Sequence, residues 1–97
     1  MERQEAIARL KAHEVELRKL GVEHLYLFGS TARDEARADS DVDLFIEHPI
    51  ASLGLVQLVG LQEFTSDILG RKSDLMTRRS LHPVLREAIE ASAIQVF

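Results

Sequence analysis

The residues from 29 to 44 constrain the fold of this chain more than any other stretch. Gly29 and Ser30 directly follow the apolar run at residues 25–28, and ten residues separate Ser30 from Asp41. This order predicts a strand, a glycine turn and then a short polar helix. Glycine lets backbone N–H groups approach a ligand closely, and the amino end of a helix favours anions. The stretch therefore predicts a phosphate-binding turn.

Two acidic residues close this stretch. Asp41 and Asp43 stand two apart in a segment that continues with the apolar residues 44–46. If the segment is a strand, both carboxylates leave from the same face. Because Asp is disfavoured in strands and two close carboxylates repel each other, we expect a cation between them. A divalent ion of the Mg²⁺ type, which prefers oxygen ligands and is commonly shared with substrate phosphates, meets this requirement.

The pattern of Gly29-Ser30, ten residues and Asp41-x-Asp43 resembles the signature of the DNA polymerase beta type nucleotidyltransferases. Residues 28–44 as a whole are similar to the minimal bacterial members, the MNT proteins. These are commonly encoded beside a HEPN-type partner in toxin-antitoxin pairs. Asp74, in the short apolar segment at residues 72–77, matches the third carboxylate of the family. The lone Asp-x-Asp pair is a weak signal, whereas the pair joined to Gly-Ser and to a third Asp is a strong one.

This resemblance implies a fold, a reaction and cofactors. The fold is the nucleotidyltransferase fold, an α/β (α+β) domain with a small mixed sheet covered by helices. The reaction is transfer of AMP from ATP to a hydroxyl, with two Mg²⁺ ions held by Asp41, Asp43 and Asp74. Gly29 and Ser30 would hold the pyrophosphate portion, and Asp74 would act as the base that draws in the acceptor hydroxyl.

The acceptor is left open by the sequence. The resemblance favours a side-chain hydroxyl of a HEPN-type toxin, which this protein would neutralise as an antitoxin. A different class of answer is a binding module that blocks its partner by contact while its nucleotide site is idle. A third is an adenylyltransferase of small antibiotics, which is disfavoured because we expect no separate acceptor-binding domain.

One residue departs from the family pattern. Members often read Gly-Ser-x-Ala-Arg-Gly, and Asp34 stands at the last of these positions. Asp adopts a left-handed backbone more readily than most residues, so we expect the turn to form. The extra negative charge near the phosphate site is expected to weaken binding.

Length and composition agree with one compact domain spanning residues 1–97. A chain of 97 residues has room for a single core. Zero cysteines exclude disulfides, a thiolate nucleophile and a Cys-ligated zinc. The charged first twenty residues do not resemble a signal peptide, and no apolar run approaches a membrane span, so we expect a cytoplasmic protein. The net charge of −4 argues against direct nucleic-acid binding.

Periodicity in the first half predicts four elements. Residues 2–20 form an expected helix ended by Gly21, with His13 at the rim of its apolar stripe, and residues 22–28 form an expected central strand. A polar helix follows at 31–38. Within it, Arg33 either reaches a phosphate or pairs with neighbouring acids in solvent. The strand at 41–47 alternates between two faces and ends with an exposed Glu47.

The second half is dominated by a helix expected at residues 53–69 and capped by Ser52. Its apolar residues fall all round the helical wheel, so it is either sandwiched within the monomer or contacts a second protein chain, in a homo-oligomer or with a partner. A strand at 72–77, a helix capped by Ser80 and an edge strand at 93–97 complete the pattern.

Overall fold

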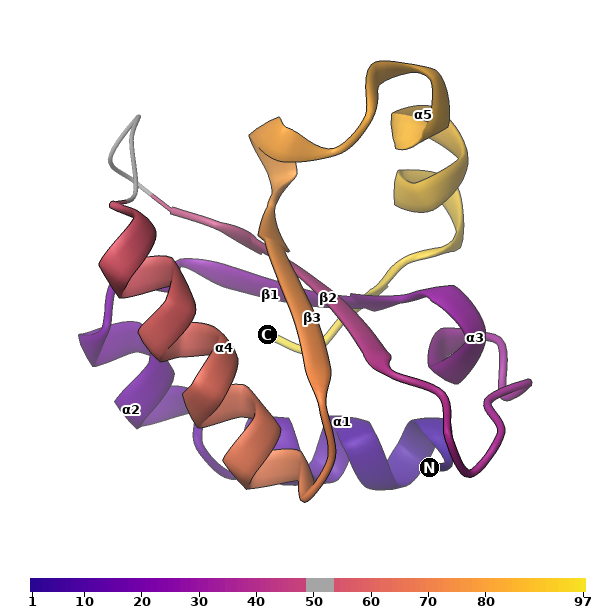
Figure 1. Ribbon diagram of the computed structural model, residues 1–97, viewed down its shortest axis with the longest axis horizontal. Coiled ribbons are helices and arrows are strands. Elements are labelled where there is room, and N and C mark those ends of the chain that lie inside the picture. The colour runs from indigo at the N-terminus through magenta and orange to yellow at the C-terminus, as the bar shows by residue number, and fades with distance from the viewer. Residues whose placement is uncertain (49–53) are drawn as a thin grey trace.

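A mixed four-stranded sheet forms the centre of the computed structural model, which describes residues 1–48 and 54–97. The strand order is β3-β2-β1-β4, with β1 antiparallel to β2 and β4 and with β2 parallel to β3. Figure 1 shows how helices flank this sheet. The elements in chain order are α1 (Arg3–Lys11), α2 (Glu14–Lys19), β1 (His24–Phe28), α3 (Gly29–Ala32), β2 (Val42–Glu47), α4 (Leu55–Leu69), β3 (Ser73–Thr77), the 3-10 helix η1 (Arg78–Ser80), α5 (Pro83–Ser92) and β4 (Ile94–Gln95).

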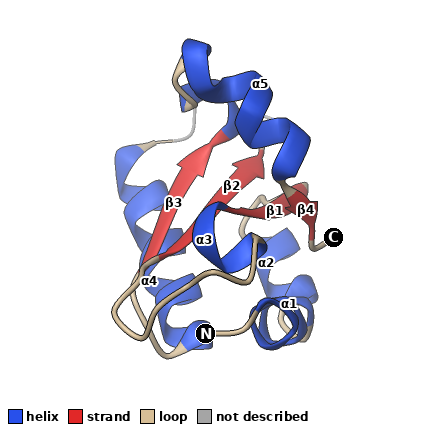
Figure 2. Cartoon of the chain, turned by 90° about the vertical axis from the view of Figure 1, so that its right-hand side faces the viewer, coloured by secondary structure: helices blue, strands red, loops and turns tan. Residues whose placement is uncertain are grey.

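The two faces of the sheet carry different cores. Val42, Leu44 and Ile46 belong to the larger cluster, which also holds buried side chains of α1, α2 and α4. Phe45, on the opposite face, packs in a smaller cluster with Phe28 and Leu81. Helix α5 lies on the side of this second cluster, away from α1, α2 and α4 (Figures 1 and 2). The predicted alternation of β2 and the central position of β1 are therefore confirmed.

The single helix expected at residues 2–20 is wrong, because the chain turns at Ala12 and His13 between α1 and α2. A straight helix of that length would extend about 28 Å. The molecule itself measures 33 × 31 × 21 Å. The turn keeps both halves against the sheet, where Leu10 and Leu17 are fully buried.

The polar helix expected at 31–38 is also wrong. Helix α3 covers only Gly29–Ala32, and Asp34 ends the helical run in a left-handed conformation with φ 58°. The turn expected at Asp34 is thus present. Because a helix of one turn has little dipole to offer, any anion must rely on local backbone N–H groups instead.

Helix α4 is buried along only part of its surface. Leu61, Thr65 and Leu69 are buried, whereas Leu55, Val56 and Val59 are exposed at the amino-terminal half. Gly70 ends the helix with φ 69°, as predicted. Ser52, the predicted cap, lies outside the described residues. In the described parts of the chain, no helix is long and apolar enough to cross a membrane.

The last helix begins later than predicted. The hydroxyl of Ser80 donates to the carbonyl of Thr77 within the turn around η1, so Ser80 is not the cap. His82 takes that place, with its Nδ1 accepting from the backbone N–H of Val84 at 3.2 Å. The delay lets Leu81 enter the second cluster before the helix starts. The predicted C-terminal edge strand is confirmed as β4.

Candidate active site

Strand pairing brings two of the predicted carboxylates together. In the sheet register, Asp43 of β2 lies opposite Phe28 of β1 and Asp74 of β3. It therefore lies between the glycine turn and the third acid. A Cβ added at Gly29, whose φ is 73°, would overlap with the carboxylate of Asp43. Only glycine can fill this position, both for its backbone angle and for the space available.

The acids also interact electrostatically. Partial burial raises the pKa of Asp43 above its ordinary value of 3.8, and the negative charges of Asp74 and Asp41 raise it further. The positive charge of Arg33 opposes this shift. Asp43 therefore lies in a group of acids at one end of the sheet, and burial and the neighbouring charges disfavour its charged form.

Asp41 lies one residue before β2 and is exposed. Its Oδ2 is 3.8 Å from the Nζ of Lys72, and the Nη1 of Arg71 donates to the carbonyl of Ser40 at 3.3 Å. Neither basic residue was predicted as a member of this site. Their position directly before Ser73 and Asp74 was the signal that could have found them.

Of the two alternatives that the sequence left open for Arg33, the structure shows pairing with a neighbouring acid, and the phosphate contact stays a prediction. The Nε of Arg33 donates to Glu35 at 3.1 Å, as a solvated arginine would. Its charge nevertheless acts on Asp43. Arg33 therefore lies near the site but is held by an acid in the absence of ligand.

The donor set is compatible with a divalent cation. Asp41, Asp43 and Asp74 offer only carboxylate oxygens, which are the ligands that Mg²⁺ prefers. The mutual repulsion recorded in the pKa of Asp43 is the penalty that a cation would remove. Among the described residues, however, the three aspartates do not form a group in which one donor atom from each lies within 4.8 Å of the others. Glu23, His24 and Glu47 do form such a group.

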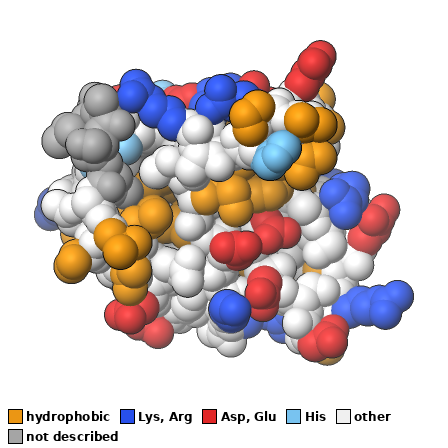
Figure 3. Space-filling model, turned by 45° about the horizontal axis from the view of Figure 1, so that its top comes forward, with side chains coloured by type: hydrophobic (Ala, Val, Ile, Leu, Met, Phe, Trp, Pro, Cys, Tyr) orange, Lys and Arg blue, Asp and Glu red, His pale blue; other side chains and the backbone are white. Residues whose placement is uncertain are grey.

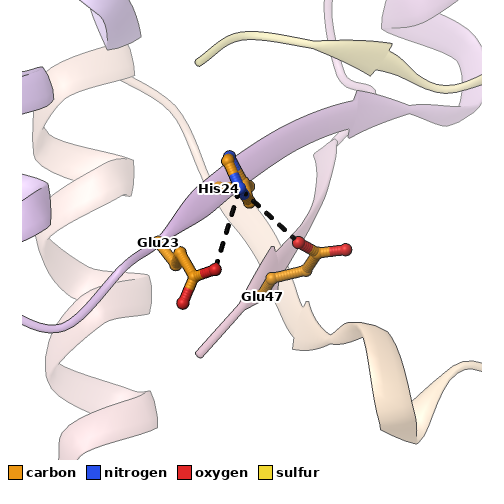
Figure 4. Close-up of side chains that lie close together, drawn as sticks. All are labelled: Glu23, His24 and Glu47. Carbon is orange, nitrogen blue, oxygen red and sulfur yellow. Dashed lines mark ion pairs between the residues drawn. The ribbon is translucent and has the colours of Figure 1, made fainter. Parts of the chain in front are cut away.

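That second group lies at the opposite end of β2 (Figure 4). The Nε2 of His24 is 3.8 Å from Glu23 and 3.9 Å from Glu47. Glu47 also accepts a hydrogen bond from Arg78, which donates to Glu90 at 3.0 Å. The expectation that Glu47 is an exposed strand end is therefore wrong: its side chain is 28% exposed and is paired with Arg78. A cation would have to compete with this arginine.

An aromatic row connects the two ends of this face. Tyr26 and Phe28 flank Phe45, with ring centroids 4.6 Å and 5.6 Å apart, respectively. Phe45 follows Asp43 by two residues and therefore shares its face of the sheet. In the space-filling view, acidic side chains lie beside a strip of apolar ones (Figure 3).

Known proteins are similar to this chain in sequence and in fold. Residues 10–96 match the family described as the nucleotidyltransferase domain. Protein adenylyltransferase MntA of Thermococcus cleftensis is 39% identical over 87 residues, which cover 82% of this chain and 86% of the relative. A solved structure described provisionally as a minimal nucleotidyltransferase has a TM-score of 0.81 at 33% identity, covering 97% of this chain and 95% of its own.

Two toxin-antitoxin structures share the fold at lower identity. One, solved with AMP-PNP, has a TM-score of 0.76 at 23% identity and covers 92% of this chain and 72% of its own. The other holds a tri-AMPylated HEPN toxin of Shewanella oneidensis in complex with an MNT antitoxin, with a TM-score of 0.62, 22% identity and coverages of 89% and 70%. The resemblance to minimal nucleotidyltransferases is confirmed by the family match and by the relatives above 30% identity, and the chain therefore belongs to the nucleotidyltransferase domain family.

Proposed function

We propose that this nucleotidyltransferase, acting as a single domain over residues 1–97, transfers AMP from ATP to a hydroxyl group. The observation that carries the proposal is the packing of Asp43 against Gly29 and beside Asp74. The proposed phosphate-binding turn and the proposed metal ligands would thus act on the same nucleotide. The protein adenylyltransferase name of the relative from Thermococcus cleftensis supports the choice of AMP as the transferred group.

Each site residue has a proposed role. The backbone N–H groups at Gly29 and Ser30 bind the pyrophosphate portion, and Arg33 exchanges Glu35 for a phosphate oxygen. Asp41, Asp43 and Asp74 are the proposed metal ligands, and Asp74 also accepts the acceptor proton. Two Mg²⁺ ions, when bound, would supply positive charge for the attacking and leaving oxygens.

The proposed acceptor is a side-chain hydroxyl of a HEPN-type partner, and the protein acts as the antitoxin of that pair. Support comes from the complex of an MNT antitoxin with a tri-AMPylated HEPN toxin. The exposed apolar residues Leu55, Val56 and Val59 of α4 are a proposed contact surface for this partner or for a second copy of the chain. A partner bound there without any transfer would correspond to the binding-module alternative.

Calorimetry with ATP tests the nucleotide site directly. We expect binding with Mg²⁺ and little binding in chelator, because the carboxylates repel the triphosphate unless cations intervene. Asp43→Asn should weaken binding in Mg²⁺. Glu47→Gln, on the same face of the same strand, is the matched control and should bind like the wild type. Equal wild-type affinity in chelator and in Mg²⁺ would contradict metal-dependent binding.

Transfer is tested by incubating the protein with ATP, Mg²⁺ and a HEPN-type protein encoded next to it. We expect the intact mass of the partner to increase by one or more adenylyl groups. A partner that is neutralised without any mass increase would overturn the enzymatic proposal and support neutralisation by contact.

A further inference from the structure

Asp34 makes a contact that a glycine in its place would lack. Its Oδ1 accepts a hydrogen bond from the backbone N–H of Arg3 at 2.9 Å, and its Oδ2 lies 3.9 Å from the guanidinium of Arg3. The Nη1 of Arg3 in turn donates to the carbonyl of Ala32 at 3.4 Å. The start of α1 and the end of α3 are therefore joined by reciprocal contacts between residues that are about thirty positions apart in the chain.

These contacts satisfy backbone groups that would otherwise be open at both helix ends. Glu2, at the N-cap of α1, makes no side-chain capping bond, so the carboxylate of Asp34 supplies the cap from across the fold. Negative charge at this end also suits the helix dipole. Arg3 does the complementary task for α3 by binding one of its last carbonyl oxygens.

Helix α3 needs such external support. It has four residues, too few for a helix to be stable by itself. Yet it carries Gly29 against Asp43 at one end and leads into Arg33 at the other. A shift of this single turn would move both the proposed phosphate-binding groups and the arginine.

We propose that Asp34 is a positioning residue for nucleotide binding: together with Arg3 it latches α3 to the amino end of α1 and so holds the phosphate-binding turn in place. This inference rests on the proposed function for its nucleotide readout. The latch itself is a property of the protein without ligand. The left-handed backbone at Asp34, with φ 58°, is what aims the carboxylate at Arg3 while ending α3.

The charge of Asp34 by itself would weaken nucleotide binding, because an acid near a triphosphate repels it. This effect is opposite to that of the latch. Two variants separate these opposing effects. Asp34→Asn removes the charge but keeps an oxygen for the N–H of Arg3 and tolerates the left-handed backbone. Asp34→Gly keeps the backbone conformation but removes both the charge and the acceptor. If repulsion dominates, both variants bind ATP more tightly, whereas if the latch dominates, only the glycine variant binds more weakly.

The experiment measures ATP affinity in Mg²⁺ by calorimetry and amide hydrogen exchange of the ligand-free protein. For Asp34→Gly we expect about 3- to 10-fold weaker binding, the range that corresponds to loss of a helix cap, and faster exchange at residues 3–6 and 29–34. Asp34→Asn should restore most of the affinity and protection. Arg3→Ala removes the contact with the carbonyl of Ala32 but keeps the backbone N–H that Asp34 accepts, so it should change both readouts in the same direction as Asp34→Gly and by less. Glu14→Gln, which weakens the Glu14–Arg18 pair of α2 outside both exchange windows, is the control and should change neither readout.

The outcomes separate this inference from the proposed function. Tighter or unchanged ATP binding by Asp34→Gly would overturn the positioning role. If the wild type does not bind ATP, the proposed function fails, and the exchange data still test the latch. Unchanged exchange at residues 29–34 in Asp34→Gly would then show that Asp34 does not hold the turn.

Discussion

The two ends of β2 each carry acids on the same face of the sheet, but the charged groups around these acids differ. At the start of the strand, Asp43 lies beside Asp74 and near Asp41, and its pKa is raised by burial and by their charges. At the far end, Glu47 and Glu90 are bound by Arg78, and the hydrogen bond from Arg78 lowers the pKa of Glu90. At the start of the strand the nearest charged neighbours of Asp43 include two acids, whereas at the far end two acids are bound directly by one arginine.

We propose that this difference separates a ligand-binding role from a structural one. Arg78 joins η1 to β2 and α5, and it lies 5.6 Å from the ring centroid of Tyr26 and 5.9 Å from that of Phe45. Its pairs are satisfied within the protein and need no ligand. Burial and the neighbouring acids disfavour the charged form of Asp43, and a carboxylate in such surroundings is typical of functional sites.

Loss of Asp74 from the aspartate end of β2 should have the largest effect. We expect this effect on the rate of AMP transfer and not on ATP binding. We expect Asp74→Asn to reduce transfer by about 10² to 10³, because both a base and a negative charge are removed while the shape is kept. ATP affinity should change little, since Asp41 and Asp43 remain. Single-turnover assays with the HEPN-type partner and calorimetry with ATP measure the two effects. A wild-type transfer rate in Asp74→Asn would show that the third carboxylate lies elsewhere.

Loss of Arg78 at the far end of β2 should instead lower the stability of the fold. Arg78→Ala leaves Glu47 and Glu90 without their donor and removes the link between β2 and α5. Because the arginine side chain is 37% exposed, solvent screens much of this loss, and we expect the free energy of unfolding to fall by on the order of 1 kcal/mol. Urea denaturation measures it. ATP affinity should be unchanged, and a large loss of affinity would mean that the two ends are coupled.

The two ends should also respond to pH with opposite signs, the smallest of the expected effects. The raised pKa of Asp43 means that its contribution to stability is fully present below pH 3.8 and is lost as the pH rises through its folded-state pKa. The lowered pKa of Glu90 means that its contribution is present above pH 4.5 and is lost as the pH falls through its folded-state pKa.

Urea denaturation of the ligand-free protein at pH 7 and at pH 4, close to the ordinary pKa of an aspartate, tests the first of these signs. Relative to the wild type, Asp43→Asn should be more stable at pH 7, and this advantage should shrink at pH 4, because a raised pKa favours protonation of Asp43 there. An advantage that is equal at both values would show that Asp43 is not under electrostatic strain in the folded protein.

The sequence predicted the mixed sheet from its alternating helices and strands, whereas the grouping of Gly29, Asp43 and Asp74 came from the family resemblance. Strand alternation settles which face Asp43 occupies, and the turn after Phe28 settles where Gly29 lies. The roles of these residues remain predictions. The break at His13, the short α3 and the cap at His82 depend on contacts between distant segments, and periodicity carries no such information.

The distant ion pairs were out of reach for the same reason. Arg3 meets Asp34, and Arg78 meets Glu47, each across 31 positions of the chain. A sequence pattern shows that these charges exist but not which of them meet. Glu47 was consequently read as a solvated strand end.

The parallel pairing of β2 with β3 also affects when the site forms. Asp43 and Asp74 become neighbours only after the chain has passed through α4 and returned, a connection whose closure is slow compared with that of the antiparallel β1 and β2. During synthesis, β1 and β2 emerge first and can pair before Asp74 has been made. We therefore expect the repulsion between the two carboxylates to arise late in folding. By then, the pairing of β1 with β2 can offset its cost.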